Sequence, residues 1–207
     1  MQNKRCLIFD MDGTLIDSSE VICNAINYVR RHLGLDAMEH ESILRGINDL
    51  SIHAPSYFYG IDAYREEHIL WFQEYYTKYH QKETRCYPGI ARLLQKLTDA
   101  SKTLTIATNA YRRSAEQILF ANKIDRYFDL LVCADEVEQG KPDPEMIELI
   151  MAYYALPAEA FLLIGDSPKD LEAARRAGID AISVNWGFSE IDEAIRSTAS
   201  LEKLLLQ

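Results

Sequence analysis

The sequence predicts an α/β protein with a parallel sheet flanked by helices and an all-helical segment inserted after the first strand. Two observations predict this fold class. Short uncharged apolar runs, typical of strands buried on both faces, alternate with segments whose apolar residues recur at helical spacing. Residues 16–83 interrupt that alternation and show helical patterns only. Alternating strands and helices pack as a parallel sheet with helices on both of its faces.

The first strand is predicted at Cys6–Phe9, which leads into Asp10 and an Asp12-Gly13 turn. In the inserted segment, helices are predicted after Asp17, around residues 43–47 and over residues 61–79. A turn follows at residues 86–89. Strands are then predicted at 104–108, 130–133, 161–164 and 181–184, and helices from 90 and over 114–121, 145–154, 171–177 and 199–206. We therefore expect a core domain of residues 1–15 and 84–207 and a helical cap domain of residues 16–83.

The composition limits the partners of the chain. Its 22 basic and 32 acidic residues give a formal net charge of -10, which argues against a nucleic acid or an anionic membrane as the main partner. The sequence has no signal-peptide pattern and no apolar run long enough to span a bilayer. Its four cysteines lack the paired spacing of metal ligands. We expect a cytoplasmic protein with reduced thiols, a monomer or a weak dimer.

Polar residues follow four of the predicted strands. In open parallel sheets, ligands bind beyond the carboxyl ends of the strands, so these residues should converge. They are Asp10 and Asp12 after the first strand, Thr108 and Asn109 after the second, residues 140–144 after the third and residues 165–170 after the fourth. The inserted segment is attached close to Asp10. It would therefore lie over the strand ends, where it could act as a lid.

These residue types suit phosphoryl transfer. A carboxylate such as Asp10 can attack phosphorus, and a second one such as Asp12 can carry protons. Carboxylate oxygens suit Mg²⁺, while the Thr108 hydroxyl and the Lys141 ammonium can bind phosphoryl oxygens. Each feature also has a structural explanation when taken alone: a turn, a strand end, a solvated lysine, and a helix N-cap at residues 165–170. Only their joint occurrence favours the chemistry.

The four segments together resemble the four motifs of the haloacid dehalogenase superfamily of phosphohydrolases. They read FDMDGTL, TN, GKPDPEM and GDSPKDLEAARRAG, and the inserted segment resembles the helical cap of that family. The resemblance implies a Rossmann-like parallel sheet and a phosphoric monoester hydrolase that uses Mg²⁺. It implies that Asp10 is the nucleophile and a metal ligand. It implies that Asp12 is the general acid/base and binds the metal through its carbonyl. The remaining motif residues would bind the phosphoryl group (Thr108, Asn109, Lys141) and the metal (Asp166, Asp170).

Within the superfamily, the layout most resembles the phosphoglycolate phosphatase group, which hydrolyses small phosphomonoesters through an aspartyl phosphate. Arg45 and Asn48 lie in a segment that resembles the substrate-specificity loop of the cap, so they are candidate substrate-binding residues. A β-phosphoglucomutase-like phosphotransferase is an alternative. It is weakened by Asp49, which stands where the mutase pattern has a cation. A non-catalytic binding protein on the same fold is a second alternative. The complete set of motif carboxylates and Lys141 argues against it.

Overall fold

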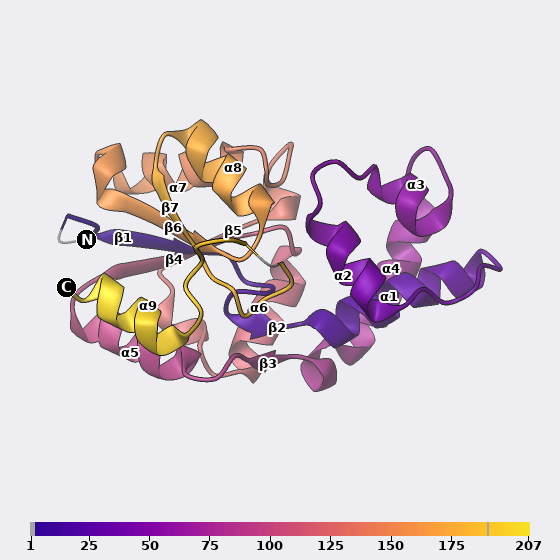
Figure 1. Cartoon of the computed structure of the whole chain (residues 1–207), viewed down its shortest axis with the longest axis horizontal. Coiled ribbons are helices and arrows are strands. Elements are labelled where there is room, and N and C mark those ends of the chain that lie inside the picture. Colours follow the sequence, from indigo (N-terminus) through magenta and orange to yellow (C-terminus); the bar gives the residue numbers. More distant parts are fainter. Residues whose placement is uncertain (1–2, 190) are drawn as a thin grey trace.

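The computed structural model describes residues 3–189 and 191–207 and has at its centre a five-stranded parallel sheet (Figure 1). The strand order is β5-β4-β1-β6-β7, and every adjacent pair is parallel. The strands are β1 (Cys6–Phe9), β4 (Thr103–Thr108), β5 (Leu130–Cys133), β6 (Phe161–Gly165) and β7 (Asp180–Ser183). The α/β fold with a parallel sheet is therefore confirmed, and the strand nearest the N-terminus occupies the centre of the sheet.

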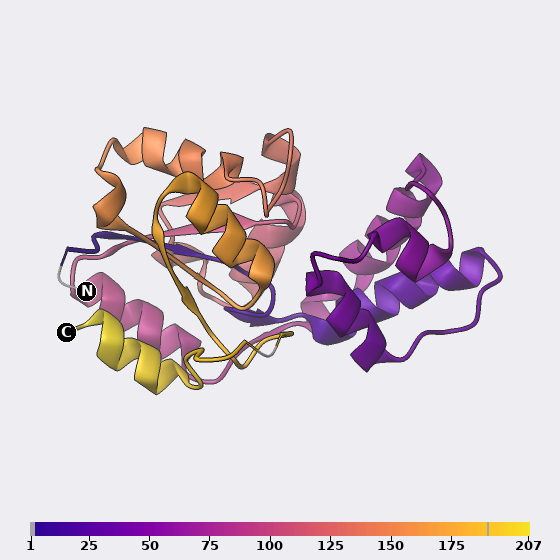
Figure 2. The same ribbon diagram turned by 45° about the horizontal axis from the view of Figure 1, so that its top comes forward.

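Helices cover both faces of the sheet. Successive side chains of β1 point to opposite faces and all four are buried, so both faces must be covered. Leu7 and Phe9 pack with helices α5, α6 and α9, whereas Cys6 and Ile8 pack with α7 and α8. Figure 2 shows the two helical layers on either side of the sheet. The helices are α5 (Ile90–Asp99), α6 (Arg112–Ala121), α7 (Glu145–Tyr154), α8 (Pro168–Ala177) and α9 (Thr198–Leu205), with short 3-10 turns at Asp125–Tyr127, Ala134–Glu136 and Ala158–Ala160. Because both faces are covered, the central strand β1 is buried and apolar along its whole length.

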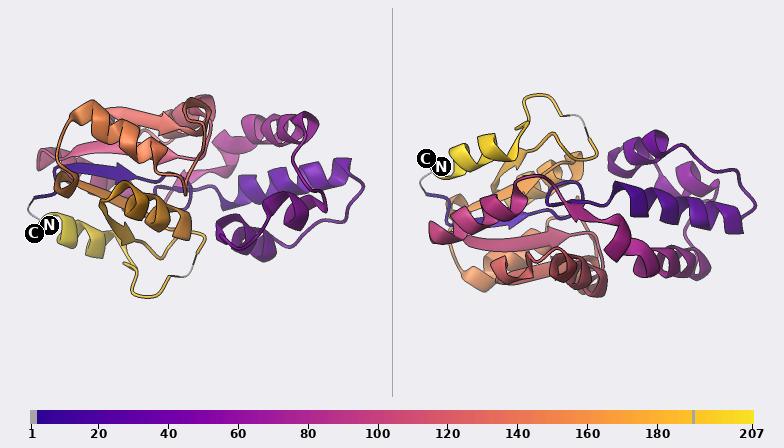
Figure 3. Two further views of the ribbon diagram at one scale, coloured as in Figure 1. Left: turned by 90° about the horizontal axis from the view of Figure 1, so that it is seen from above. Right: turned by 90° about the horizontal axis from the view of Figure 1, so that it is seen from below.

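A second group of helices stands beyond one end of the sheet, away from the two chain termini (Figures 1 and 3). This helical unit has its own apolar cluster, which includes Cys23, Val29, Ile43 and Phe58. Its members are α1 (Ser19–His32), α2 (His40–Asn48), α3 (Ala54–Tyr59) and α4 (Glu66–Glu83). The chain enters it through β2 (Ile16–Asp17) and leaves through β3 (Arg85–Cys86), which pair antiparallel. Two adjacent strands therefore connect the helical unit to the rest of the molecule.

The helical unit contains the main differences from the sequence prediction. No strand was expected within residues 16–83, but β2 begins at Ile16. Two residues are too few to show an alternation of apolar and polar side chains. The long helix predicted over 61–79 is α4, which begins at Glu66 and ends at Glu83. The short helix α3 before it was not predicted, and Gly60 ends α3 in the left-handed conformation with φ of 67°. None of the described helices is both long and apolar enough to cross a membrane.

Candidate active site

The side chains that follow β1, β5 and β6 meet at Lys141. The Lys141 ammonium donates hydrogen bonds to Oδ1 of Asp10 and to Oδ1 of Asp170, each over 2.6 Å. All three side chains are buried. An ammonium group buried without compensating charge would be strongly unfavourable, and so would two adjacent buried carboxylates. The triad of Asp10, Lys141 and Asp170 is therefore stable only as a set, and it fixes the position of the Asp10 carboxylate.

The loop that carries Lys141 is held by Asn109 at the end of β4. The Asn109 side chain accepts a hydrogen bond from the Lys141 backbone N–H at 2.8 Å and donates one to the Lys141 carbonyl at 2.9 Å. Gly140 permits this approach, because a Cβ there would lie 2.6 Å from Oδ1 of Asn109. Asn109 thus positions Lys141 with both of its polar side-chain atoms. The adjacent Thr108 hydroxyl is buried and accepts a hydrogen bond from Ala110 N–H at 3.1 Å.

Three buried carboxylates could hold a metal ion. Asp10, Asp166 and Asp170 each offer one oxygen, and these oxygens lie within 4.8 Å of one another. Hard oxygen donors of this kind fit a divalent cation such as Mg²⁺. Asp166 is aimed into the cluster by hydrogen bonds from the Thr14 hydroxyl at 3.2 Å and from Phe188 N–H at 2.8 Å. Lys141 is the cation bonded to two of these carboxylates, whereas both of the bonds that Asp166 accepts come from neutral donors. The donor set therefore fits a divalent cation beside Asp166.

Burial dominates the electrostatics of the cluster. It raises the pKa of Asp10 well above the ordinary value, although the charge of Lys141 acts in the opposite direction. It also raises the pKa of Asp166 to about 7, with a further contribution from the negative charge of Asp170. Burial alone would lower the pKa of Lys141. Its two carboxylate partners outweigh that effect, so the lysine stays charged. The cluster thus has an excess of carboxylates that a bound cation would offset.

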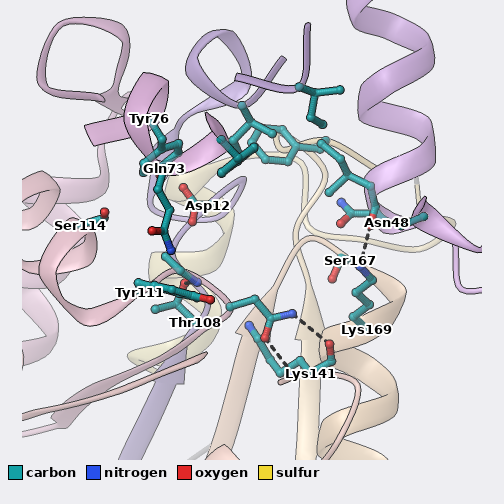
Figure 4. A pocket seen from close by; sticks show the side chains of 18 of the residues that line it. Asp12, Asn48, Gln73, Tyr76, Thr108, Tyr111, Ser114, Lys141, Ser167 and Lys169 are labelled. Carbon is teal, nitrogen blue, oxygen red and sulfur yellow. Dashed lines mark hydrogen bonds between the residues drawn. The ribbon is translucent and has the colours of Figure 1, made fainter. Parts of the chain in front are cut away.

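Asp12 lies next to this cluster but has different partners. Its Oδ1 accepts a hydrogen bond from the Ser18 hydroxyl over 2.5 Å. Burial raises the pKa of Asp12, and hydrogen bonds from Ser18 and Tyr76 partly offset that shift. Figure 4 shows Tyr76, which comes from α4 of the helical unit, beside Asp12. A carboxyl group whose pKa is raised keeps its proton more readily, which suits it to donating and accepting protons.

A cavity of about 630 Å³ lies between the strand ends and the helical unit. Its lining includes every predicted site residue of the core: Asp10, Asp12, Thr108, Asn109, Lys141, Asp166 and Asp170. From the predicted specificity segment it includes Asn48, whose Nδ2 donates to the Ser189 hydroxyl at 2.9 Å. A second bond joins the core to the helical unit: the Lys169 ammonium in α8 donates to the carbonyl of Ile47 in α2 at 2.6 Å.

Arg45 does not line this cavity, in contrast to the expectation from the specificity segment. It is exposed, and its guanidinium contacts Ser42 on the outer side of α2. Two residues along a helix turn the side chain by about 200°. Because Ile43 faces the core of the helical unit, Arg45 points away from it. We therefore no longer place Arg45 at the substrate.

Sequence reasoning missed the residues that hold the predicted carboxylates in place. Ser18 and Tyr76 contact Asp12, and Thr14 contacts Asp166. Ser167 was expected only as a helix N-cap. It does cap α8, and its hydroxyl and N–H both donate to Oδ2 of Asp170 at 2.6 and 3.1 Å. The one signal for Thr14 and Ser18 in the sequence is their closeness to the Asp10–Asp12 segment.

Comparison with known proteins agrees with this architecture. The model of the haloacid dehalogenase-like hydrolase family matches residues 7–184. The phosphoglycolate phosphatase of Aquifex aeolicus is 29% identical over 191 residues, which cover 92% of this chain and 89% of that protein. The pyrophosphatase PpaX of Bacillus mycoides is also 29% identical, over 181 residues covering 87% of this chain and 83% of that protein. The crystal structure of a protein from Clostridium acetobutylicum, described as a predicted phosphatase, has a TM-score of 0.87 with 25% identity and 98% of both chains covered. Since the family match takes in nearly all of β1, the whole of β4, β5 and β6 and all four loops of the site, this chain belongs to the haloacid dehalogenase-like hydrolases.

Proposed function

We propose that the protein is a magnesium-dependent phosphatase that hydrolyses a small phosphomonoester through an aspartyl-phosphate intermediate. The observation that carries the proposal is the position of the Asp10 carboxylate. It is buried, held by Lys141 at 2.6 Å, adjacent to Asp166 and Asp170, and part of the cavity wall. The phosphatase names of the relatives from Aquifex aeolicus and Bacillus mycoides support the same reaction type.

In the first half-reaction, an oxygen of Asp10 attacks phosphorus while the bond from phosphorus to the ester oxygen breaks. Asp12 gives its proton to the departing oxygen and becomes a carboxylate. In the second half-reaction, Asp12 takes a proton from water, whose oxygen attacks phosphorus. The bond to Asp10 breaks, and inorganic phosphate and the free Asp10 carboxylate remain. The raised pKa of Asp12 suits both transfers, and the Lys141 ammonium offsets the negative charge on the phosphoryl group and on Asp10.

Asp10, Asp166 and Asp170 are the side chains that would hold Mg²⁺, and the carbonyl of Asp12 is a further candidate ligand. The cation would supply positive charge that offsets the phosphoryl oxygens. Thr108 would bind the phosphoryl group through its hydroxyl, and Asn109 would act chiefly by fixing Lys141. We also propose that residues 16–83 form a cap domain over the core of residues 1–15 and 84–207. The β2–β3 connection and the bonds of Asn48 and Lys169 across the boundary support this division.

The proposal is tested by release of phosphate from p-nitrophenyl phosphate. We expect activity that requires Mg²⁺, is abolished by a chelator and falls by about a thousandfold or more in Asp10→Asn, which keeps the shape of the side chain but removes the nucleophile. The matched control is Asp62→Asn, an exposed aspartate of the helical unit, which should leave activity unchanged. Full activity of Asp10→Asn would exclude the aspartyl-phosphate mechanism.

A further inference from the structure

The wall of the cavity that faces the carboxylates is apolar and aromatic. It comes from the helical unit, where α1 contributes Ile22 and Ile26, α3 contributes Phe58 and Tyr59, and α4 contributes Ile69 and Phe72. Apolar and aromatic walls bind groups that gain free energy by leaving water. A cavity of about 630 Å³ is also far larger than a phosphoryl group with a two-carbon acid requires. The wall therefore has room for a ring or a group of similar bulk.

The cations that line the cavity all come from the core. Among the described residues they are Lys141, Lys169 and Arg113, and the lining contributed by α1–α4 includes neither lysine nor arginine. Lys141 is bound by Asp10 and Asp170, and Lys169 is directed to the carbonyl of Ile47. Arg113 is exposed at the beginning of α6. A carboxylate or a second phosphate placed against α1, α3 and α4 would lose its hydration without gaining a lysine or arginine partner from those helices.

Apart from the His68 imidazole, the polar groups of the wall are amides and hydroxyls. Gln73 and Tyr76 extend from α4 toward the strand ends in Figure 4, and Thr77 follows them along the helix. The amide of Asn48 is already bonded to Ser189. Amide and hydroxyl groups can bind the hydroxyl groups of a neutral leaving group but cannot neutralise a charged one. The wall thus combines apolar area with a small capacity for hydrogen bonds.

We infer that the substrate is the phosphate monoester of an uncharged alcohol that carries an aromatic or other bulky apolar group. Such a group would pack against α1, α3 and α4 while the phosphoryl group sits at Asp10. This inference rests on the proposed phosphatase function and narrows its substrate class. It sets the protein apart from its relatives named phosphoglycolate phosphatase and pyrophosphatase, whose named substrates carry a second negatively charged group.

Three alkyl esters of comparable chemical reactivity test the inference: 2-phenylethyl phosphate, ethyl phosphate and phosphoglycolate, with pyrophosphate as a further substrate. With the full chain and Mg²⁺, kcat/KM for 2-phenylethyl phosphate should exceed that for ethyl phosphate by about tenfold or more, and phosphoglycolate should be the poorest of the three. A higher kcat/KM for phosphoglycolate or pyrophosphate would overturn the inference and leave the phosphatase function intact. Absence of Mg²⁺-dependent hydrolysis of every ester, p-nitrophenyl phosphate included, would overturn the phosphatase function itself.

A binding measurement removes any dependence on turnover. The non-hydrolysable pair 2-phenylethylphosphonate and 2-carboxyethylphosphonate differs only in a phenyl ring against a carboxylate. Calorimetry should give a Kd about tenfold or more lower for the phenyl compound. Equal affinities, or tighter binding of the carboxylate, would contradict an apolar wall that selects the leaving group.

A substitution in the wall tests its position. Ile69 lines the cavity and is 41% exposed, so Ile69→Lys should fold and should place a cation at the wall. The control is Leu70→Lys on the next residue of α4, which is 55% exposed and lies outside the cavity lining. We expect the ratio of kcat/KM for phosphoglycolate to that for 2-phenylethyl phosphate to rise about tenfold in Ile69→Lys. The ratio should stay at the wild-type value in Leu70→Lys. If both variants keep the wild-type ratio, the wall does not contact the leaving group.

Discussion

The two sides of the cavity are built on opposite physical principles. On the core side, charged groups such as Lys141 and Asp166 are almost completely buried, and each has two polar partners. On the side of the helical unit, apolar and aromatic side chains such as Phe58 and Phe72 line the cavity, and no lysine or arginine of α1–α4 is part of the lining. Buried charge networks fix geometry because every lost partner is costly, whereas apolar contacts tolerate change. We infer that the core side determines the reaction and the helical side determines the substrate.

Among the changes on the core side of the cavity, removal of Lys141 should cause the largest loss of stability and activity. In Lys141→Met, Asp10 and Asp170 would remain buried without the cation they share. We expect unfolding in urea without metal at pH 7 to show a loss of about 3–5 kcal/mol, and kcat to fall by about a thousandfold. Lys203→Met, at an exposed position of α9, is the matched control and should change neither quantity. Wild-type stability of Lys141→Met would mean that the triad is not the charge network described above.

Replacement of Ser18, which bonds to Asp12 on the core side of the cavity, should have a smaller effect than the loss of Lys141. Burial raises the pKa of Asp12, and the hydrogen bond from Ser18 lowers it. Ser18→Ala should therefore raise that pKa further. We expect kcat to fall by about ten- to a hundredfold and the pH dependence of kcat to be displaced toward higher pH, with KM nearly unchanged.

Ser19→Ala is the control for this test. The neighbouring Ser19 hydroxyl bonds to Asp17 at 2.6 Å instead of to Asp12. The control should therefore keep the wild-type pH profile. An unshifted profile in Ser18→Ala would show that Ser18 affects only the fold.

The pH dependence of stability distinguishes the charged side from ordinary acid unfolding. In the folded protein, burial raises the pKa of Asp166 from 3.8 to about 7. Between these two values the folded state binds more protons than the unfolded state, so this group's contribution to stability decreases as pH rises. The Tm of the chelator-treated protein, relative to that of Asp166→Asn, should fall by several degrees from pH 4.5 to pH 7.5.

Added Mg²⁺ should restore the Tm of the wild type at pH 7.5, and much less at pH 4.5, where protons occupy the carboxyl groups. In Asp166→Asn the cation should have little effect on Tm at either pH. Parallel Tm curves for the two proteins, with or without Mg²⁺, would show that Asp166 neither loses hydration on folding nor participates in a cation site.

The same contrast explains what the sequence could predict. Runs such as Cys6–Phe9 identify strands because burial on both faces excludes charge, and parallel strands bring their polar ends to one edge. The convergence of Asp10, Lys141 and Asp166 followed from these two facts. The helical wall was not predictable in this way, because it depends on how α3 and α4 meet the core. The short helix α3, which ends at a left-handed Gly60, was not predicted, because six residues are too few to show a helical periodicity.

Contacts between side chains were the least predictable feature. Asn109 was expected at the phosphoryl group, but its amide is bonded on both sides to the backbone of Lys141. Ser18 reaches back to Asp12 because α1 begins directly after β2, a relation set by three-dimensional geometry. Residue type and position therefore identified the groups that converge at the cavity. The groups that orient them emerged only from the structure.

The smallest expected effect lies where the two sides of the cavity meet. Asn48 ends α2, lines the cavity and bonds to Ser189 of the core, whereas Arg45 on the same helix is exposed and lies outside the cavity lining. Loss of one hydrogen bond between neutral groups corresponds to about 0.5–1.5 kcal/mol, so Asn48→Ala should raise KM about two- to tenfold with kcat largely retained. Arg45→Ala should change KM by less than about twofold. If Arg45→Ala raised KM more than Asn48→Ala, the outer face of α2 would contribute to substrate binding, and the division between a charged core side and an apolar helical side would have to be redrawn.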